Sequence, residues 1–297
     1  MKTNKYIILL LTILAFTYAC DDDGGDSKID LIDAAIPNMT KSDGSELILD
    51  LNRIANGEVI TISFNAELAQ GNPEKTDVVG VLVTLAGPIY TAVLDENAAL
   101  PQVYSLTTDD IVAAFSQLNS ADDLALGDVL NITTRYTLDN GLIIDIIDED
   151  GSSGTGTNPQ NNVLFNPVIA YPVSCPSDLS GNYTVVSSGF STDGAPINNP
   201  LVNFSYDVVL TDNGGGSYTI SDGVAGVYQD WYCAPYGYCF ETAGTFTDVC
   251  GSLSGSWVEA FGCQVDLTGT VNTDGTLTIQ WVNCFGDEVT EAIYTRN

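Results

Sequence analysis

Six of the seven cysteines lie in the last 123 residues, and this uneven distribution constrains the fold more than any other feature. An even number of cysteines in an exported chain indicates disulfide bonds, and six cysteines allow about 15 connectivities. We expect the pairs Cys175–Cys250, Cys233–Cys239 and Cys263–Cys284, of which only the short Cys233–Cys239 loop has a local argument. Zinc is the competing interpretation, but the spacings lack the CxxC pairs typical of zinc sites. Because residues 21–174 contain no cysteine, a domain boundary is expected just before Cys175.

The first 19 residues have the pattern of a secretory signal peptide. Two lysines precede an apolar run, Tyr6–Phe16, that is too short to span a bilayer. A small residue, Ala19, then precedes Cys20. This ending resembles the bacterial lipobox, whose cysteine is acylated and becomes the new N-terminus, although positions 17 and 18 depart from its usual residues. An ordinary signal peptide with a free thiol at Cys20 is the alternative.

An acidic run, Asp21-Asp22-Asp23, directly follows Cys20. Such a run resembles the export signal of Bacteroidota lipoproteins that reach the outer cell surface. The resemblance implies lipidation at Cys20, a tether over residues 20–28 and an outer-membrane location facing the cell exterior. Two or three acyl chains would attach the protein stably, whereas a single chain binds only marginally.

The charge balance restricts the possible partners. The chain has 39 acidic residues, and once Lys2 and Lys5 leave with the signal only six basic residues remain, so the net charge falls to about −33. Such a charge repels nucleic acid and anionic membranes. Histidine is absent, which excludes histidine-dependent triads and histidine metal sites. Because 44% of the residues are hydrophobic, we expect a folded chain.

Residues 29–172 are predicted to form an immunoglobulin-like β-sandwich with one short helix, because short apolar runs alternate with turn signals. Asp139-Asn140-Gly141 joins two of these runs and reads as a hairpin turn. The expected strands are Leu47–Leu51, Val59–Phe64, Val78–Leu85, Tyr90–Leu94, Val129–Leu138 and Leu142–Ile147.

The expected helix begins after Thr107, which can cap it, and Asp110 can reach back to complete a capping box. Leu106 and Ile111 occupy the two positions of a hydrophobic staple. Ile111, Phe115 and Leu118 then form one apolar helix face.

A polar segment follows at residues 148–158. Its simplest interpretation is a solvated loop. The alternative is a calcium loop formed by Asp145, Asp148 and Asp150, although the segment lacks the full spacing of an EF-hand.

Residues 173–297 are predicted to form a disulfide-stapled antiparallel β-barrel or sandwich, because apolar residues alternate along several runs. The last clear hairpin places Asn272 opposite Thr276, with glycine at the left-handed position of a three-residue loop. This register brings Cys263 opposite Phe285, one residue from Cys284, so a Cys263–Cys284 bridge requires a bulge.

An aromatic-rich stretch from Tyr228 to Phe240 is the candidate ligand site. Rigid aromatic rings suit sugar faces and lose little entropy on binding. Gln229, Asp230 and Asn283 could hydrogen-bond sugar hydroxyls. The alternative is that these rings pack in a core, as we expect for Trp257 and Trp281. The candidate ligand-binding residues are Tyr228, Asp230, Trp231, Tyr232, Tyr236 and Tyr238.

The arrangement resembles the SusE/SusF-like accessory lipoproteins of Bacteroidota glycan-uptake loci. The resemblance rests on the Cys20-Asp21-Asp22-Asp23 start, the sandwich next to the anchor and the aromatic β-domain beyond it. It implies capture of extracellular polysaccharide without catalysis, cofactor or metal. A glycosidase would need two matched carboxylates, and nothing in the sequence selects such a pair. The alternative function is a structural or accessory subunit of an outer-membrane transport or adhesion complex.

Overall fold

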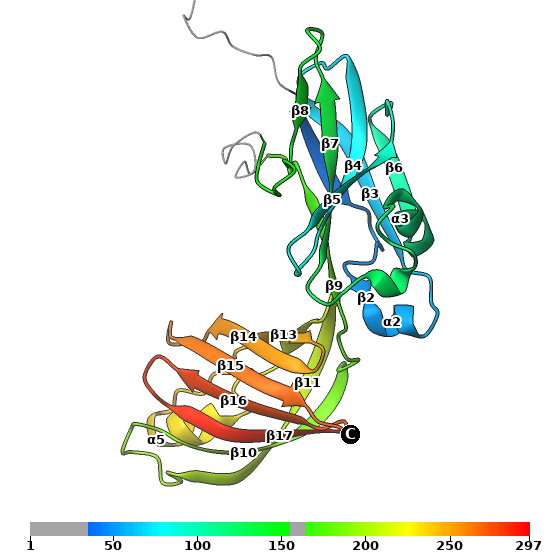
Figure 1. Cartoon of the computed structure of the whole chain (residues 1–297). Helices are drawn as coiled ribbons and strands as arrows, with labels where there is room; N and C mark the ends of the chain where they lie inside the picture. The colour runs from blue at the N-terminus through cyan, green and yellow to red at the C-terminus, as the bar shows by residue number, and fades with distance from the viewer. Residues whose placement is uncertain (1–34, 155–163) are drawn as a thin grey trace, which may run out of the picture. The chain divides into compact units, whose positions relative to one another are not determined.

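The computed structural model describes residues 35–154 and 164–297, which form a β-sandwich and a closed β-barrel (Figure 1). This architecture confirms the predicted all-β fold. Cys20, the signal peptide and the tether over residues 20–28 lie outside the described residues. Within the described part of the chain, no helix has the length and apolar character needed to cross a bilayer.

The sandwich consists of two sheets. The smaller sheet has the strand order β1-β3-β6 and contains β1 (Ile36–Lys41), β3 (Thr61–Gln70) and β6 (Gln102–Thr107). The larger sheet has the order β2-β9-β7-β4-β5, with β8 also paired to β7. Its strands are β2 (Leu49–Asp50), β4 (Lys75–Val83), β5 (Ile89–Asp95), β7 (Val129–Thr137), β8 (Ile143–Asp145) and β9 (Ile169–Ser174).

One apolar core fills the space between the two sheets. Alternate residues of β3, among them Ile62 and Phe64, are fully buried. They belong to the same cluster as Leu130 of β7 and Tyr171 of β9. Burial on one side of the smaller sheet explains the period-two pattern of β3.

The predicted capped helix is α3 (Thr108–Ala114). Thr107 Oγ1 accepts a hydrogen bond from the Asp110 N–H, and the Asp110 carboxylate accepts one from the Thr107 N–H, so the capping box is complete. Ile111 and Phe115 are each 1% exposed and close the sandwich core. The predicted helix face of Ile111, Phe115 and Leu118 is wrong in its second half, because the helix ends at Ala114 and the backbone is already extended at Phe115. A single turn of 3-10 helix, η1 (Ala121–Asp123), follows.

The predictions of a strand over Leu47–Leu51 and of a single helix in this domain are wrong. Only Leu49–Asp50 is extended, and a second helix, α2 (Leu51–Ala55), begins immediately afterwards. The physical reason is the side chain of Asp50, which accepts hydrogen bonds from the N–H groups of Asn52 and Arg53 and caps the helix.

The turn at Asp139-Asn140-Gly141 joins β7 to β8 as predicted, and the Leu138 N–H donates to the Leu142 carbonyl across it. Farther along, Asp145 forms an ion pair with Arg135 at 2.6 Å. One of the three carboxylates of the alternative calcium loop is therefore already paired with a cation of the chain. Among the described residues, no group of three or more acidic or cysteine side chains is placed to hold a metal ion.

The barrel contains eight antiparallel strands in sequence order, and β10 pairs with β17 to close it (Figure 1). Closure leaves no free sheet edge. The strands are β10 (Gly181–Phe190), β11 (Leu201–Gly214), β12 (Ser217–Ile220), β13 (Gly244–Val249), β14 (Ser252–Val258), β15 (Gln264–Val271), β16 (Leu277–Asn283) and β17 (Glu288–Arg296).

The turn between β15 and β16 has the predicted geometry. The Asn272 N–H donates to the Thr276 carbonyl at 2.8 Å, and Gly275 has a φ of 84°. Beyond Asn283, however, the chain leaves the strand in a turn over residues 284–286. Cys284 lies in this turn, so the turn, and not the expected bulge, allows it to bond to Cys263.

The segment between β12 and β13 fills one end of the barrel. It contains the π-helical turn η2 (Gln229–Cys233) and the short helix α5 (Ala234–Tyr236). Val227, Tyr228 and Trp231 of this segment belong to the barrel core. We call residues 221–243 the plug.

Candidate functional site

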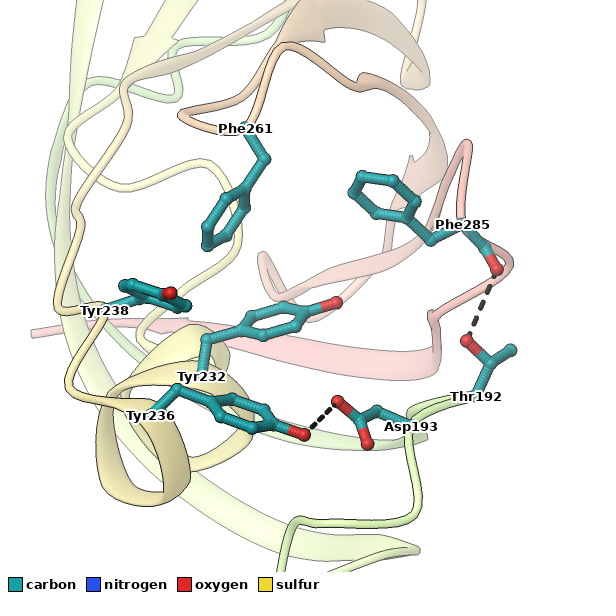
Figure 2. A pocket seen from close by; sticks show the side chains of 7 residues that line it. All are labelled: Thr192, Asp193, Tyr232, Tyr236, Tyr238, Phe261 and Phe285. Atoms are coloured by element: carbon teal, nitrogen blue, oxygen red, sulfur yellow. Dashed lines mark hydrogen bonds between the residues drawn. The ribbon is translucent and has the colours of Figure 1, made fainter.

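Four connections meet at the plugged end of the barrel because successive turns of an antiparallel barrel alternate between its two ends. They are residues 191–200, the plug, residues 259–263 and residues 284–287. Together they form a pocket of about 490 Å³, within the range of about 300–1,000 Å³ typical of ligand sites. The chain enters the barrel at the opposite end, at the start of β10. The pocket is lined by Thr192, Asp193, Tyr232, Tyr236, Tyr238, Phe261 and Phe285 (Figure 2).

Aromatic rings set at different angles form the walls. Phe261 lies 5.1 Å from Tyr232 and 6.0 Å from Tyr238 between ring centroids, at interplanar angles of 58° and 75°. Tyr236 stacks on Tyr238 at 6.1 Å. Figure 2 shows these four rings around one opening, with Phe285 across from them. Tyr238 is 53% exposed and Phe285 51%, so the rings are accessible from solvent.

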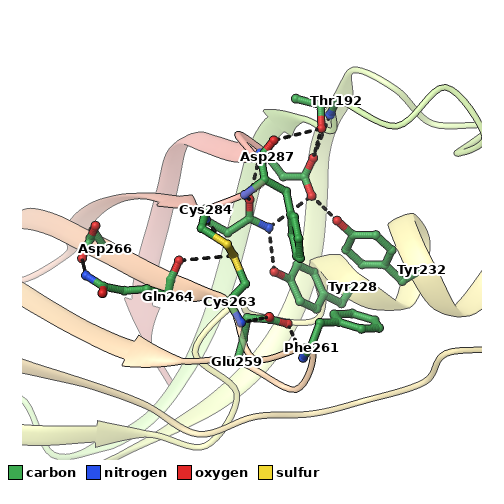
Figure 3. The surroundings of a disulfide bond; sticks show 12 residues. Thr192, Tyr228, Tyr232, Glu259, Phe261, Cys263, Gln264, Asp266, Cys284 and Asp287 are labelled. Atoms are coloured by element: carbon green, nitrogen blue, oxygen red, sulfur yellow. Dashed lines mark hydrogen bonds between the residues drawn. A yellow bond between two sulfur atoms is a disulfide. The ribbon is translucent and has the colours of Figure 1, made fainter.

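Two of the three disulfides hold these rings in place. Cys233–Cys239 closes the loop that carries Tyr236 and Tyr238. Cys263–Cys284 joins the connection that carries Phe261 to the one that carries Phe285 (Figure 3). Three of the four connections that form the pocket are therefore restrained by disulfides before any ligand arrives.

Glu259 shapes the connection that carries Phe261. Its carboxylate accepts hydrogen bonds from the backbone N–H groups of Phe261, at 3.0 Å, and Cys263, at 2.8 Å. Glu259 is only 4% exposed. This buried carboxylate replaces backbone partners that the tight turn lacks and so fixes the position of the Phe261 ring.

Asp287 lies beneath the pocket and is 1% exposed. Its Oδ1 accepts hydrogen bonds from the Thr192 N–H and from the hydroxyls of Thr192 and Ser191, at 2.7–3.0 Å. Its Oδ2 accepts from the Tyr232 hydroxyl and from Asn283 Nδ2 (Figure 3). Burial by itself would raise the pKa of Asp287, but these hydrogen bonds outweigh it and lower that pKa below its ordinary value.

Asp193 lies at the edge of the opening and is partly exposed. The Tyr236 hydroxyl donates to its Oδ2 at 2.7 Å, and the Ala195 N–H donates to its Oδ1 at 3.0 Å (Figure 2). The hydrogen bond from Tyr236, followed by that from Ala195, lowers the pKa of Asp193. The carboxylate is therefore charged at neutral pH.

Of the predicted ligand-binding residues, Tyr232, Tyr236 and Tyr238 line the pocket. Tyr228 and Trp231 do not, because they are 3% and 0% exposed and pack against Trp281 in the barrel core. Their assignment as ligand contacts is corrected by this burial.

The three polar partners suggested for a sugar also lie away from the opening. Asp230 accepts a hydrogen bond from Asn198 at 3.2 Å and does not line the pocket. Asn283 is 4% exposed and is engaged with Tyr228 and Asp287. Gln229 is not among the lining residues either.

Sequence reasoning missed Thr192, Asp193, Phe261 and Phe285. A signal was available for the two phenylalanines, because Phe261 lies two residues before Cys263 and Phe285 directly follows Cys284. No comparable signal marks Thr192 or Asp193, which reach the site only through closure of the barrel.

The disulfide pairs are Cys175–Cys250, Cys233–Cys239 and Cys263–Cys284. They are the three pairs that the sequence analysis proposed. The first of them joins the residue that follows β9 to the turn between β13 and β14.

Comparison with protein-family models gives a match over the barrel. Residues 174–294 match a family model whose description reads "-like, C-terminal domain". No curated protein matches the chain. A lipoprotein from Bacteroides thetaiotaomicron is similar to it in structure, with 16% identity and a TM-score of 0.32 over 67% of this chain and 90% of that one. A protein of unknown function from Bacteroides ovatus has 12% identity and a TM-score of 0.21 over 88% and 94% of the two chains.

Proposed function

We propose that this chain is a lipid-anchored cell-surface protein that captures extracellular glycan, without catalysis, in the aromatic pocket at the plugged end of the barrel. The observation that carries the proposal is the set of five aromatic rings that line a pocket of about 490 Å³. The C–H faces of a pyranose ring pack on aromatic rings, and hydroxyl or carboxylate groups at the edge bind the sugar hydroxyls. Thr192 and Asp193 supply such groups here.

The rigidity of the pocket walls supports a role of these rings in ligand binding. Cys233–Cys239 and Cys263–Cys284 restrain three of the connections that form the pocket. A ligand then meets rings that are already ordered, and little conformational entropy is lost on binding. Rings that only completed the core would be covered, whereas Tyr236 and Tyr238 are 46% and 53% exposed.

The anchor part of the proposal rests on Cys20 and the acidic run after it. We expect acylation at Cys20, an outer-membrane location and exposure to the cell exterior. Metabolic labelling with a palmitate analogue checks the first point, because the wild-type protein should carry the label and Cys20→Ala should not. Protease treatment of intact cells checks exposure to the cell exterior. A surface-exposed protein should be degraded, whereas a protein inside the cell envelope would survive.

Glycan capture is tested by measuring binding of the purified protein to a broad panel of polysaccharides. We expect at least one soluble polysaccharide to bind, and Tyr238→Ala to weaken that binding about tenfold because it removes one wall. Phe190→Ala is the matched control: Phe190 is 42% exposed at the end of β10 but does not line the pocket. Equal losses in both variants, or no binding by the wild type, would contradict the proposal.

The absence of catalysis is tested on the same panel. We expect no release of reducing ends from any polysaccharide that binds. Measurable turnover that Asp193→Asn abolishes would instead make the pocket an active site.

A second candidate is an accessory subunit of an outer-membrane transport or adhesion complex. One observation favours it: Ile197, in the connection between β10 and β11, is 98% exposed. An apolar side chain so fully exposed suits a protein partner. If this candidate is correct, the wild-type protein co-purifies with a membrane partner, and Ile197→Asp loses that partner while its glycan binding is unchanged.

A further inference from the structure

The pocket carries negative charge that no positively charged lining residue balances. Asp193 lines its edge and Asp287 lies directly beneath, bonded to the lining residues Thr192 and Tyr232. No lining residue is basic. Residues 175–297 contain fourteen acidic residues and one basic residue, Arg296.

Arg296 forms its hydrogen bonds elsewhere in the barrel. It lies at the end of β17, and its guanidinium donates to the carbonyls of Asp178 and Ser180 near the start of β10. This is the end of the barrel opposite the pocket, because β10 and β17 are antiparallel neighbours. An anionic ligand in the pocket would therefore meet two carboxylates and no cation.

The two carboxylates differ in what they can still bind. Asp287 is buried and accepts five hydrogen bonds from the chain, which occupy both of its oxygens. Asp193 is partly exposed and accepts hydrogen bonds from Tyr236 at Oδ2 and from Ala195 at Oδ1. Because a carboxylate has about four acceptor positions, Asp193 keeps room for a donor from a ligand.

The Tyr236 ring beside Asp193 favours a donor that carries a positive charge. Tyr236 donates its hydroxyl to Asp193, so its ring lies next to the free acceptor positions, and Tyr238 stacks on it (Figure 2). Ring faces attract cations through their quadrupole. A cation at the opening would interact with a ring face and a carboxylate together, whereas a neutral hydroxyl would gain only a hydrogen bond.

We propose that the pocket selects a ligand carrying an ammonium group, which pairs with Asp193 beside the Tyr236 ring. This inference rests on the proposed glycan capture and narrows it to glycans with free amino groups, such as unacetylated glucosamine. Neutral sugars bind more weakly, and uronic or sulfated sugars are repelled.

Calorimetry with three trisaccharides on the same β-1,4-linked backbone tests the inference: glucosamine, N-acetylglucosamine and glucose. Tetramethylammonium serves as a cation without a sugar. At about 150 mM salt, which screens distant charges, we expect the glucosamine trisaccharide to bind about tenfold more tightly than the other two sugars.

The protein's overall negative charge attracts any amine, so the decisive comparison is between variants with the same change in charge. Asp193→Asn should remove the preference for glucosamine, so that the ratio of the glucosamine affinity to the glucose affinity falls from about ten to about one. Glu291→Gln, at an exposed position on β17, should leave the preference intact. An equal loss in both variants would show that only the general charge matters and would overturn the inference.

The ligands separate failure of this inference from failure of glycan capture. If all three sugars bind equally, cation selection is wrong and glycan capture stands. If tetramethylammonium binds in an Asp193-dependent way and no sugar does, cation recognition stands and glycan capture is wrong. If none of the four binds, both are wrong.

Discussion

The hydroxyl of Tyr232 donates a hydrogen bond to the buried carboxylate of Asp287. Tyr232 comes from the plug and Asp287 from the connection between β16 and β17, 55 residues later. The same carboxylate binds Thr192, from the connection between β10 and β11. One side chain therefore joins three of the four connections that form the pocket.

Asp287→Asn should lower the free energy of unfolding by about 2 kcal/mol at pH 7, because an amide offers one acceptor oxygen where the carboxylate offers two. The acid dependence should change as well. The folded pKa of Asp287 is lowered, so its contribution is present above the ordinary carboxyl pKa of about 3.9 and is lost as pH falls through the folded value. Urea unfolding at pH 7 and pH 3 should show a smaller acid effect in Asp287→Asn than in the wild type. Identical acid effects would contradict this role.

Trp231→Ala should destabilise the barrel by about 3–5 kcal/mol, because Trp231 is fully buried against Trp281. Tyr238→Ala, at a residue 53% exposed, should change stability by less than about 0.5 kcal/mol. Denaturant unfolding of the two variants measures the difference. Equal midpoints would mean that Trp231 is not the core residue described above.

Replacing both Cys233 and Cys239 with serine should weaken ligand binding, because the loop carrying Tyr236 and Tyr238 gains conformational freedom. The expected stability loss is only about 2 kcal/mol, since the bridge spans six residues. Replacing Cys175 and Cys250 should cost more stability, about 4 kcal/mol, since that bridge spans 75 residues.

The second pair serves as the control for binding, because it lies away from the pocket. The variant lacking Cys233 and Cys239 should therefore lose more ligand affinity, and the variant lacking Cys175 and Cys250 should lose more thermal stability. The same ranking in the two measurements would show that binding follows global stability alone.

Gly226→Ala and Gly237→Ala separate backbone strain from steric overlap within the plug. Both glycines have positive φ, 72° and 75°, so both variants pay a left-handed backbone cost of about 1 kcal/mol. A Cβ at Gly237 meets nothing within 4 Å, whereas one at Gly226 would come 2.2 Å from the Tyr206 ring. We expect a loss above about 3 kcal/mol for Gly226→Ala only, measured by denaturant unfolding. Similar losses for both would contradict the close approach of Tyr206.

Local patterns predicted the parts of the fold that depend on near neighbours in sequence. The capping box of Thr107 and Asp110, and the turn that ends at Gly275, involve atoms only a few residues apart. A local interaction also explains why the strand predicted over Leu47–Leu51 is wrong. The helix cap supplied by Asp50 outweighs the strand preference of the apolar residues.

The sequence by itself determined that the chain is rich in strands, that its second half is stapled by disulfides, and that aromatic residues concentrate between Tyr228 and Phe240. Alternation and turn chemistry are local, so these features could be read directly. Only the tertiary structure decided which rings are buried and which are exposed. Trp231 and Tyr238 belong to the same short stretch, yet Trp231 packs inside the barrel and Tyr238 is exposed to solvent. The reason is that only the first part of the plug packs into the barrel core.

The pocket itself is a product of barrel closure. Asp193 and Phe285 are 92 residues apart, and they line one opening because β10 pairs with β17. Pairing between strands so distant in sequence depends on the packing of the whole core, which no local pattern encodes.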